Sequence, residues 1–69
     1  MVKIFSERLK ALRIEKGFTQ PKLAERVGVS KGMISFWEQG IHEPTVSYII
    51  KLSKVLDVSS DYLLGISDF

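Results

Sequence analysis

The side chains that could carry out catalysis or bind a metal ion are few in this sequence of 69 residues. It has no cysteine and a single histidine, His42, so it offers no thiolate and too few imidazoles for a zinc or iron site made by protein alone. No glycine-rich phosphate loop follows a strand, and no inward-facing pair of carboxylates is expected. These residue types argue against an enzyme, and they indicate neither a cofactor nor a small-molecule ligand.

The charged side chains are unevenly distributed. Residues 1–31 hold eight basic and three acidic side chains, a net charge of +5, whereas residues 32–69 hold two basic and five acidic ones, a net charge of −3. Such asymmetry is typical of a protein with one face that binds a polyanion. The same charges could also form an ordinary solvated surface, and the asymmetry alone does not separate the two.

The length of the chain suits one domain, close to the lower size limit for folding without a disulfide or a metal. Its first residues carry charge at helical spacing, unlike a secretory signal, and no apolar run is long enough to span a membrane. We therefore expect one cytoplasmic domain over residues 1–69, with a core in residues 5–65 and a tail at residues 66–69.

Residues 20–39 predict two short helices joined by a tight turn. Thr19 and Ser30 can each accept a hydrogen bond from a backbone N–H of the helix that follows. Gly28 can take the left-handed conformation that ends the first helix. The apolar residues of both helices fit one inner face: they are Leu23, Ala24, Val27, Val29, Ile34 and Trp37. With the small Ala24 at the closest approach, this is the pattern of a helix-turn-helix.

Three further helices are expected around this motif. They span about residues 6–16, 46–56 and 60–64, with Ser6, Thr45 and Ser59 as their caps. Phe18 should enter the core between the first two helices. The expected inward-facing residues are Phe5, Leu9 and Leu12 in the first helix, and Val46, Ile49, Leu52, Ser53 and Leu56 in the fourth. Because no segment alternates like a strand, the sequence predicts an all-α fold of five short helices.

These motifs resemble the lambda-repressor-like DNA-binding domains, also called the Cro/C1 or XRE helix-turn-helix family, over about residues 5–65. The matching residues are Arg8-Leu9-Lys10, Leu12-Arg13, Lys16-Gly17-Phe18-Thr19-Gln20, Leu23-Ala24, Val27-Gly28-Val29-Ser30, Ile34-Ser35, Trp37-Glu38-Gln39-Gly40, Pro44-Thr45, Leu52, Leu56 and Asp61-Tyr62-Leu63-Leu64-Gly65. The resemblance implies the five-helix fold and binding to operator DNA, usually as a two-fold dimer.

The resemblance also implies roles for individual residues. Gln20 matches a phosphate-binding position, and Lys31, Gly32 and Phe36 match the positions that face base edges in the major groove. Arg13 and Glu38 match a partly buried pair that joins the first helix to the third. The full set of implied DNA-binding residues is Thr19, Gln20, Ser30, Lys31, Gly32, Met33, Ser35, Phe36, Gln39 and Thr45.

The chemistry of these side chains leaves alternatives open. Lys31 could donate to guanine O6 and N7 or bind a phosphate. Gly32 has no side chain, so it would let the helix sit close to the groove floor. Phe36 points away from the inner face; it could pack on thymine methyl groups, on the preceding helix, or on a second copy of the chain or a partner protein. Arg13 could bind a phosphate instead of serving mainly in the pair.

The loop after the third helix departs from the family's habit. Many relatives carry Lys or Arg after the glycine, whereas this chain has Ile41, His42 and Glu43. Glu43 would repel phosphate. His42 could touch phosphate when protonated, or it could be an ordinary loop histidine.

The leading interpretation is a homodimeric transcriptional regulator, a repressor of a two-fold symmetric double-stranded DNA operator. It would be either a complete small regulator or one domain of a longer protein. The alternative is a protein-interaction module, such as an antitoxin component, with an apolar surface of Phe36, Ile41, Ile66 and Phe69. Salt-dependent operator preference would favour the first, and tight, salt-insensitive binding to a protein the second.

Overall fold

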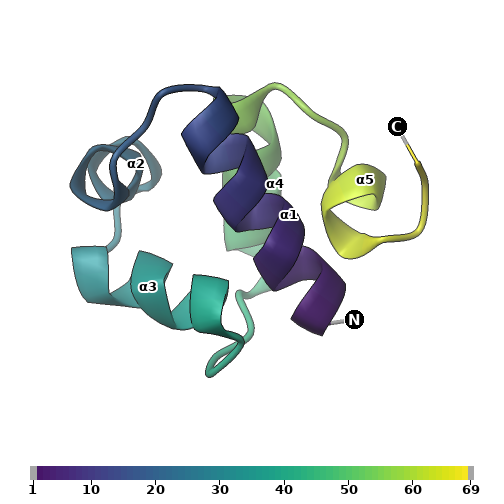
Figure 1. Cartoon of the computed structure of the whole chain (residues 1–69), viewed down its shortest axis with the longest axis horizontal. Coiled ribbons are helices and arrows are strands. Elements are labelled where there is room, and N and C mark those ends of the chain that lie inside the picture. Colours follow the sequence, from purple (N-terminus) through teal and green to yellow (C-terminus); the bar gives the residue numbers. More distant parts are fainter. Residues whose placement is uncertain (1, 69) are drawn as a thin grey trace.

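The computed structural model of the protein describes residues 2–68, with side chains from Lys3 onward. Within this range the chain forms five helices, which are α1 (Val2–Glu15), α2 (Gln20–Val27), α3 (Lys31–Gln39), α4 (Val46–Leu56) and α5 (Ser60–Leu64). Figure 1 shows α1 across the centre with α4 behind it, α2 and α3 on one side, and α5 on the other. The predicted all-α, five-helix fold is confirmed.

Every helix contributes to one apolar core. α1 packs against α3 and α5, α2 against α3 and α4, and α4 against α5. The buried residues of the core are Phe5, Leu9, Leu12, Leu23, Ala24, Val27, Ile34, Trp37, Ile49, Leu52, Leu56 and Leu63. Phe18 and Val29, which were expected inside, are only partly buried and pack against its edge. The core thus holds the two helices of the helix-turn-helix motif against α1 and α4, and α5 packs on α1 and α4 in turn.

Capping side chains define the starts of four helices. The side-chain oxygens of Thr19, Ser30, Thr45 and Ser59 each accept a hydrogen bond from the backbone N–H three residues further on, over 3.2, 3.1, 3.5 and 3.0 Å respectively. Each bond pairs a first-turn N–H that has no partner within its own helix. The structure confirms the predicted starts of α2 to α5.

The expected start of the first helix at Ser6 is wrong. α1 begins at Val2, and Ser6 lies inside it with only 5% of its surface exposed. The Ser6 hydroxyl donates to the backbone oxygen of Trp37 over 2.6 Å. Ser6 lies beside Phe5 on the buried face of α1, so its hydroxyl is used between helices and does not cap its own.

The expected inward position of Val46 is also wrong, because 76% of this side chain is exposed. Val46 is the first residue of α4, and the buried face of the helix begins one turn later at Ile49. Ser53, by contrast, behaves as expected, since its hydroxyl donates to the Ile50 oxygen of its own helix over 2.7 Å.

Arg8 joins the segment after α5 to α1. Its guanidinium donates to the backbone oxygens of Tyr62 and of Ser67, the latter over 2.9 Å, and stacks 4.2 Å from the centre of the Tyr62 ring. Of the apolar surface proposed from the sequence, Phe36, Ile41 and Ile66 are exposed. Phe69, its fourth member, lies outside the described residues.

Candidate nucleic-acid interface

The turn between α2 and α3 brings the two helices together at a fixed angle. Gly28 ends α2 in the left-handed conformation with a φ of 86°, and its N–H donates to the Ala24 oxygen over 2.8 Å. The N–H of Val29 bonds to the same oxygen over 3.0 Å. The chain then reverses directly into Ser30, the cap of α3. Because a residue with a Cβ is strained at this φ, glycine suits the turn.

The two faces of α3 differ sharply in burial. Ile34 and Trp37 are 0% and 1% exposed and lie in the core. The opposite side carries the exposed residues Lys31, Gly32, Phe36 and Gln39, with Ser35 and Met33 half-buried at its margins. We call these six residues the α3 surface. Six of the predicted DNA-binding residues therefore lie together on one helix.

The remaining predicted DNA-binding residues lie at helix starts. Thr19 and Ser30 are exposed caps of α2 and α3, and Gln20 is half-buried at the first position of α2. Thr45 caps α4, beyond the loop that follows α3. Helix starts present free N–H groups and the positive end of the helix dipole, which suit a phosphate.

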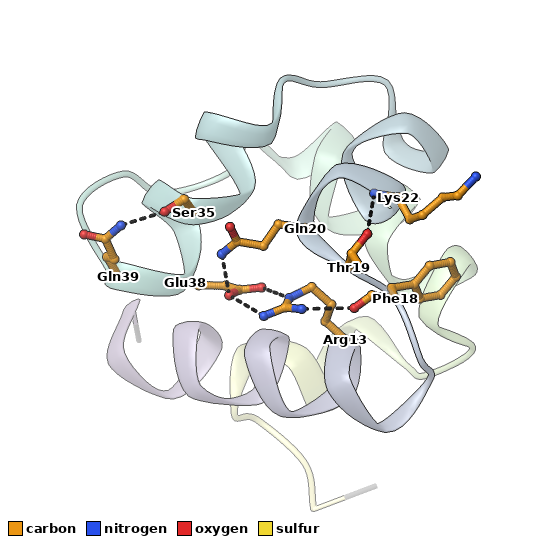
Figure 2. A network of polar contacts seen from close by, with 8 residues as sticks. All are labelled: Arg13, Phe18, Thr19, Gln20, Lys22, Ser35, Glu38 and Gln39. Atoms are coloured by element: carbon orange, nitrogen blue, oxygen red, sulfur yellow. Dashed lines mark hydrogen bonds and ion pairs between the residues drawn. The ribbon is translucent and has the colours of Figure 1, made fainter.

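A buried carboxylate holds three elements together beside the α3 surface. Glu38, with a side chain only 4% exposed, accepts from Arg13 Nε over 2.6 Å and from Arg13 Nη2 over 3.2 Å. It also accepts from Gln20 Nε2 over 3.1 Å. Arg13 donates in addition to the backbone oxygen of Phe18 over 3.0 Å. In Figure 2 Glu38 lies between Arg13 and Gln20, so α1, α2 and α3 meet at one carboxylate.

The pair between Arg13 and Glu38 was predicted, whereas the bond from Gln20 was not. This bond fixes which end of the Gln20 amide is directed at Glu38. Because an amide nitrogen has two hydrogens, Nε2 keeps a second N–H available for another acceptor. A glutamine at the start of one helix and a glutamate eighteen residues later carry no local signal of contact, so the sequence alone could not show it.

Two further contacts organise the exposed side of α3. Gln39 Nε2 donates to the Ser35 hydroxyl one turn earlier, over 2.7 Å (Figure 2). The ring of Phe36 meets the ring of His42 edge to face, with centroids 5.2 Å apart and planes at 75°. Phe36 is 40% exposed, so it neither enters the core nor packs fully on α2. The expected exposure of Phe36 is confirmed, and its contact with His42 is new.

The arrangement holds hydrogen-bond donors and the cationic side chain of Lys31. Among residues 2–68, no three His, Cys, Asp or Glu side chains lie close enough together to bind a metal ion. No helix in this range is long and apolar enough to cross a membrane. Two capped helices around a left-handed glycine, with a donor-rich face on the second, define a helix-turn-helix domain.

The sequence matches a known helix-turn-helix family and several transcriptional regulators. A family model described as helix-turn-helix matches residues 9–63. YqaE of Bacillus subtilis, an uncharacterized HTH-type transcriptional regulator, is 41% identical over 61 residues, which cover 88% of this chain and 53% of YqaE. SinR of the same organism, another HTH-type transcriptional regulator, is 39% identical over 62 residues, covering 88% of this chain and 56% of SinR.

A solved structure shows the same likeness in three dimensions. The c2 repressor of Salmonella phage P22, crystallised with a synthetic operator, superposes with a TM-score of 0.87 at 40% identity, covering 91% of this chain and 96% of that chain. The chain belongs to the Cro/C1-type (XRE) helix-turn-helix family of DNA-binding transcription regulators. It spans about half the length of the curated relatives that it matches.

Proposed function

We propose that this chain is the DNA-binding domain of a transcriptional repressor, with α3 lying in the major groove of a two-fold symmetric operator. The observation that carries the proposal is the α3 surface, which is exposed at Lys31, Gly32, Phe36 and Gln39 and carries the side-chain donors of Lys31, Ser35 and Gln39. An α-helix fits the major groove, where each base pair presents a distinct pattern of donors and acceptors. The related c2 repressor was crystallised on an operator, which supports the same use of this fold.

Each part of the candidate interface has a role in this proposal. Lys31 and Phe36 contact base edges. Gly32 has no side chain, so α3 can approach the floor of the groove closely at this position. Gln20 donates its second amide hydrogen to a phosphate, while its bond to Glu38 holds the amide in place. Thr19, Ser30, Gln39 and Thr45 lie near the DNA backbone, and phosphate contacts from these positions fix the register of α3.

The domain is expected to act as a homodimer in the cytoplasm, because a two-fold operator presents two half-sites to two copies. Residues 1–69 form one domain in this proposal, with the core in residues 5–65. The hydrogen bond from Arg8 to the Ser67 oxygen and the ion pair from Arg8 to Asp68 at 4.0 Å support including residues 66–68 in the same domain. The named relatives are transcriptional regulators, so an antitoxin component is not favoured.

The test is selection of random double-stranded DNA by the purified protein, followed by rebinding of the enriched pool at two salt concentrations. Enrichment of a two-fold symmetric sequence, with affinity that falls steeply as salt rises, would support an operator-binding dimer. A pool that stays random after repeated rounds would overturn the proposal. Weak, salt-sensitive binding to all sequences would then be non-specific attraction to phosphate.

A further inference from the structure

Phe36 is an unusual residue for an exposed donor-rich helix face. It is a large apolar side chain with 40% of its surface exposed, set among Lys31, Gly32 and Gln39. Its ring contacts that of His42, which lies outside α3 in the loop that follows. An exposed phenylalanine with a single aromatic neighbour needs an explanation beyond core packing.

The backbone at the end of α3 builds this contact. Gly40 takes the left-handed conformation with a φ of 76°, and the N–H of Ile41 donates to the backbone oxygen of Phe36 over 3.0 Å. The chain therefore turns back toward the residue whose carbonyl it binds. His42, the next residue, comes to lie against the Phe36 ring. Thr45 fixes the far end of the loop by capping α4.

The geometry of the two rings restricts the motion of Phe36. A centroid separation of 5.2 Å with planes at 75° is a favourable edge-to-face arrangement of two aromatic rings. A ring held in one orientation before binding loses less conformational freedom when it meets a ligand. The contact with His42 thus fixes the orientation of the Phe36 ring. Apart from Met33, this ring is the only large apolar group of the α3 surface.

We propose that His42 is a positioning residue that holds the Phe36 ring for contact with a thymine C5 methyl group in the major groove. This inference rests on the proposed function. The methyl group is the apolar feature that the major groove offers to an aromatic side chain. His42 acts through Phe36 in this account, and its ring matters rather than its charge.

The test measures the contribution of single methyl groups. Each thymine of a half-site in the selected duplex is replaced in turn by deoxyuridine, which lacks only the C5 methyl group. The ratio of the affinity for the thymine duplex to the affinity for the deoxyuridine duplex is measured at each position. At one position the unaltered protein should bind the thymine duplex about fourfold more tightly, the value expected for burying one such carbon. In Phe36→Ala the ratio at that position should fall to about one, because the ring that contacts the methyl group is gone.

Two variants at position 42 separate the ring from the charge. His42→Phe keeps an aromatic edge and removes the titratable group, and His42→Ala removes both. The thymine preference should persist in His42→Phe and fall below about twofold in His42→Ala, with an equal salt dependence in both. If both variants keep the thymine preference, and the dependence of their affinity on salt concentration falls by the amount expected for about one phosphate contact, then His42 binds phosphate and the inference fails.

The remaining outcomes are also decisive. Circular dichroism of each variant should show unchanged helix content, because the side chains of Phe36 and His42 are both exposed. If Phe36→Ala unfolds, Phe36→Leu takes its place and should lower the ratio of thymine to deoxyuridine affinity. If the protein selects an operator but no thymine position responds to deoxyuridine, the inference is overturned while the proposed function stands. If no operator is selected, the proposed function itself has failed.

Discussion

Replacement of Glu38 is the change that most directly tests the junction of α1, α2 and α3. Glu38→Ala would leave the Arg13 guanidinium, with a side chain 13% exposed, without its carboxylate partner, and would remove the acceptor of Gln20. Breaking a buried ion pair by removing one partner typically lowers the free energy of unfolding by about 3–5 kcal/mol. A domain of this length has a total stability of roughly 3–10 kcal/mol. We therefore expect Glu38→Ala to lose roughly a third or more of the stability of the domain at 25 °C.

A double replacement separates the loss of one charged partner from the loss of the whole ion pair. Arg13→Met together with Glu38→Leu removes both charges and keeps apolar volume, which is often close to neutral for a buried pair. The double variant also loses the bond from Arg13 to the Phe18 oxygen, a loss of about 1 kcal/mol. The double variant should consequently be more stable than Glu38→Ala by about 2 kcal/mol or more.

Urea denaturation followed by tryptophan fluorescence suits this test, because Trp37 is the single tryptophan and is 1% exposed. Glu25→Ala, an exposed glutamate of α2, is the matched control and should change the free energy of unfolding by less than about 0.5 kcal/mol. A loss below about 1 kcal/mol for Glu38→Ala would be the value of a solvent-exposed pair and would refute the reasoning.

Three further predictions follow from single contacts. Gly65→Ala should lower the free energy of unfolding by at least about 1–2 kcal/mol in urea denaturation, because Gly65 has a φ of 79° and a Cβ there would lie 2.8 Å from Ile4 Cγ2. Gly32→Ala should instead raise the free energy of unfolding by up to about 1 kcal/mol, because alanine favours a helix and the nearest atom to a Cβ there is Ser30 Oγ at 3.8 Å. With α3 in the major groove as proposed, the added methyl group should weaken operator binding in a gel-shift assay; equal or tighter binding would show that α3 does not approach the DNA closely at this point. Gln20→Ala should weaken binding to all duplexes alike and leave the salt dependence nearly unchanged, because the amide carries no charge, whereas a change in sequence preference would contradict its role as a phosphate contact.

The helix boundaries that depend on local chemistry could be predicted, and the one that depends on tertiary contact could not. Thr19 and Ser30 bond to N–H groups three residues away, so their types and positions reveal the starts of their helices. Ser6 has the same hydroxyl, but it donates to the Trp37 oxygen thirty-one residues away. Val46 fits the apolar spacing of α4, yet nothing in that spacing shows that its side chain remains exposed.

The same limit applies to the candidate interface. The outward position of Phe36 followed from its place between two inward residues of one helix. Its contact with His42 depends on the backbone turn at Gly40, and the bond from Gln20 to Glu38 depends on how α2 crosses α3. Helical spacing indicates which face a side chain occupies, whereas its partner on another element is set by the packing of the whole fold.

A pair of matched lysine variants tests most directly whether the α3 surface contacts DNA, as proposed. Lys31→Ala and Lys54→Ala each remove one exposed positive charge, the first from α3 and the second from the last turn of α4. Affinity for the selected duplex should fall at least about fivefold in Lys31→Ala, the smaller value expected for a base contact, and less than about twofold in Lys54→Ala. Equal losses in the two variants would mean that net charge, and not the α3 surface, accounts for binding.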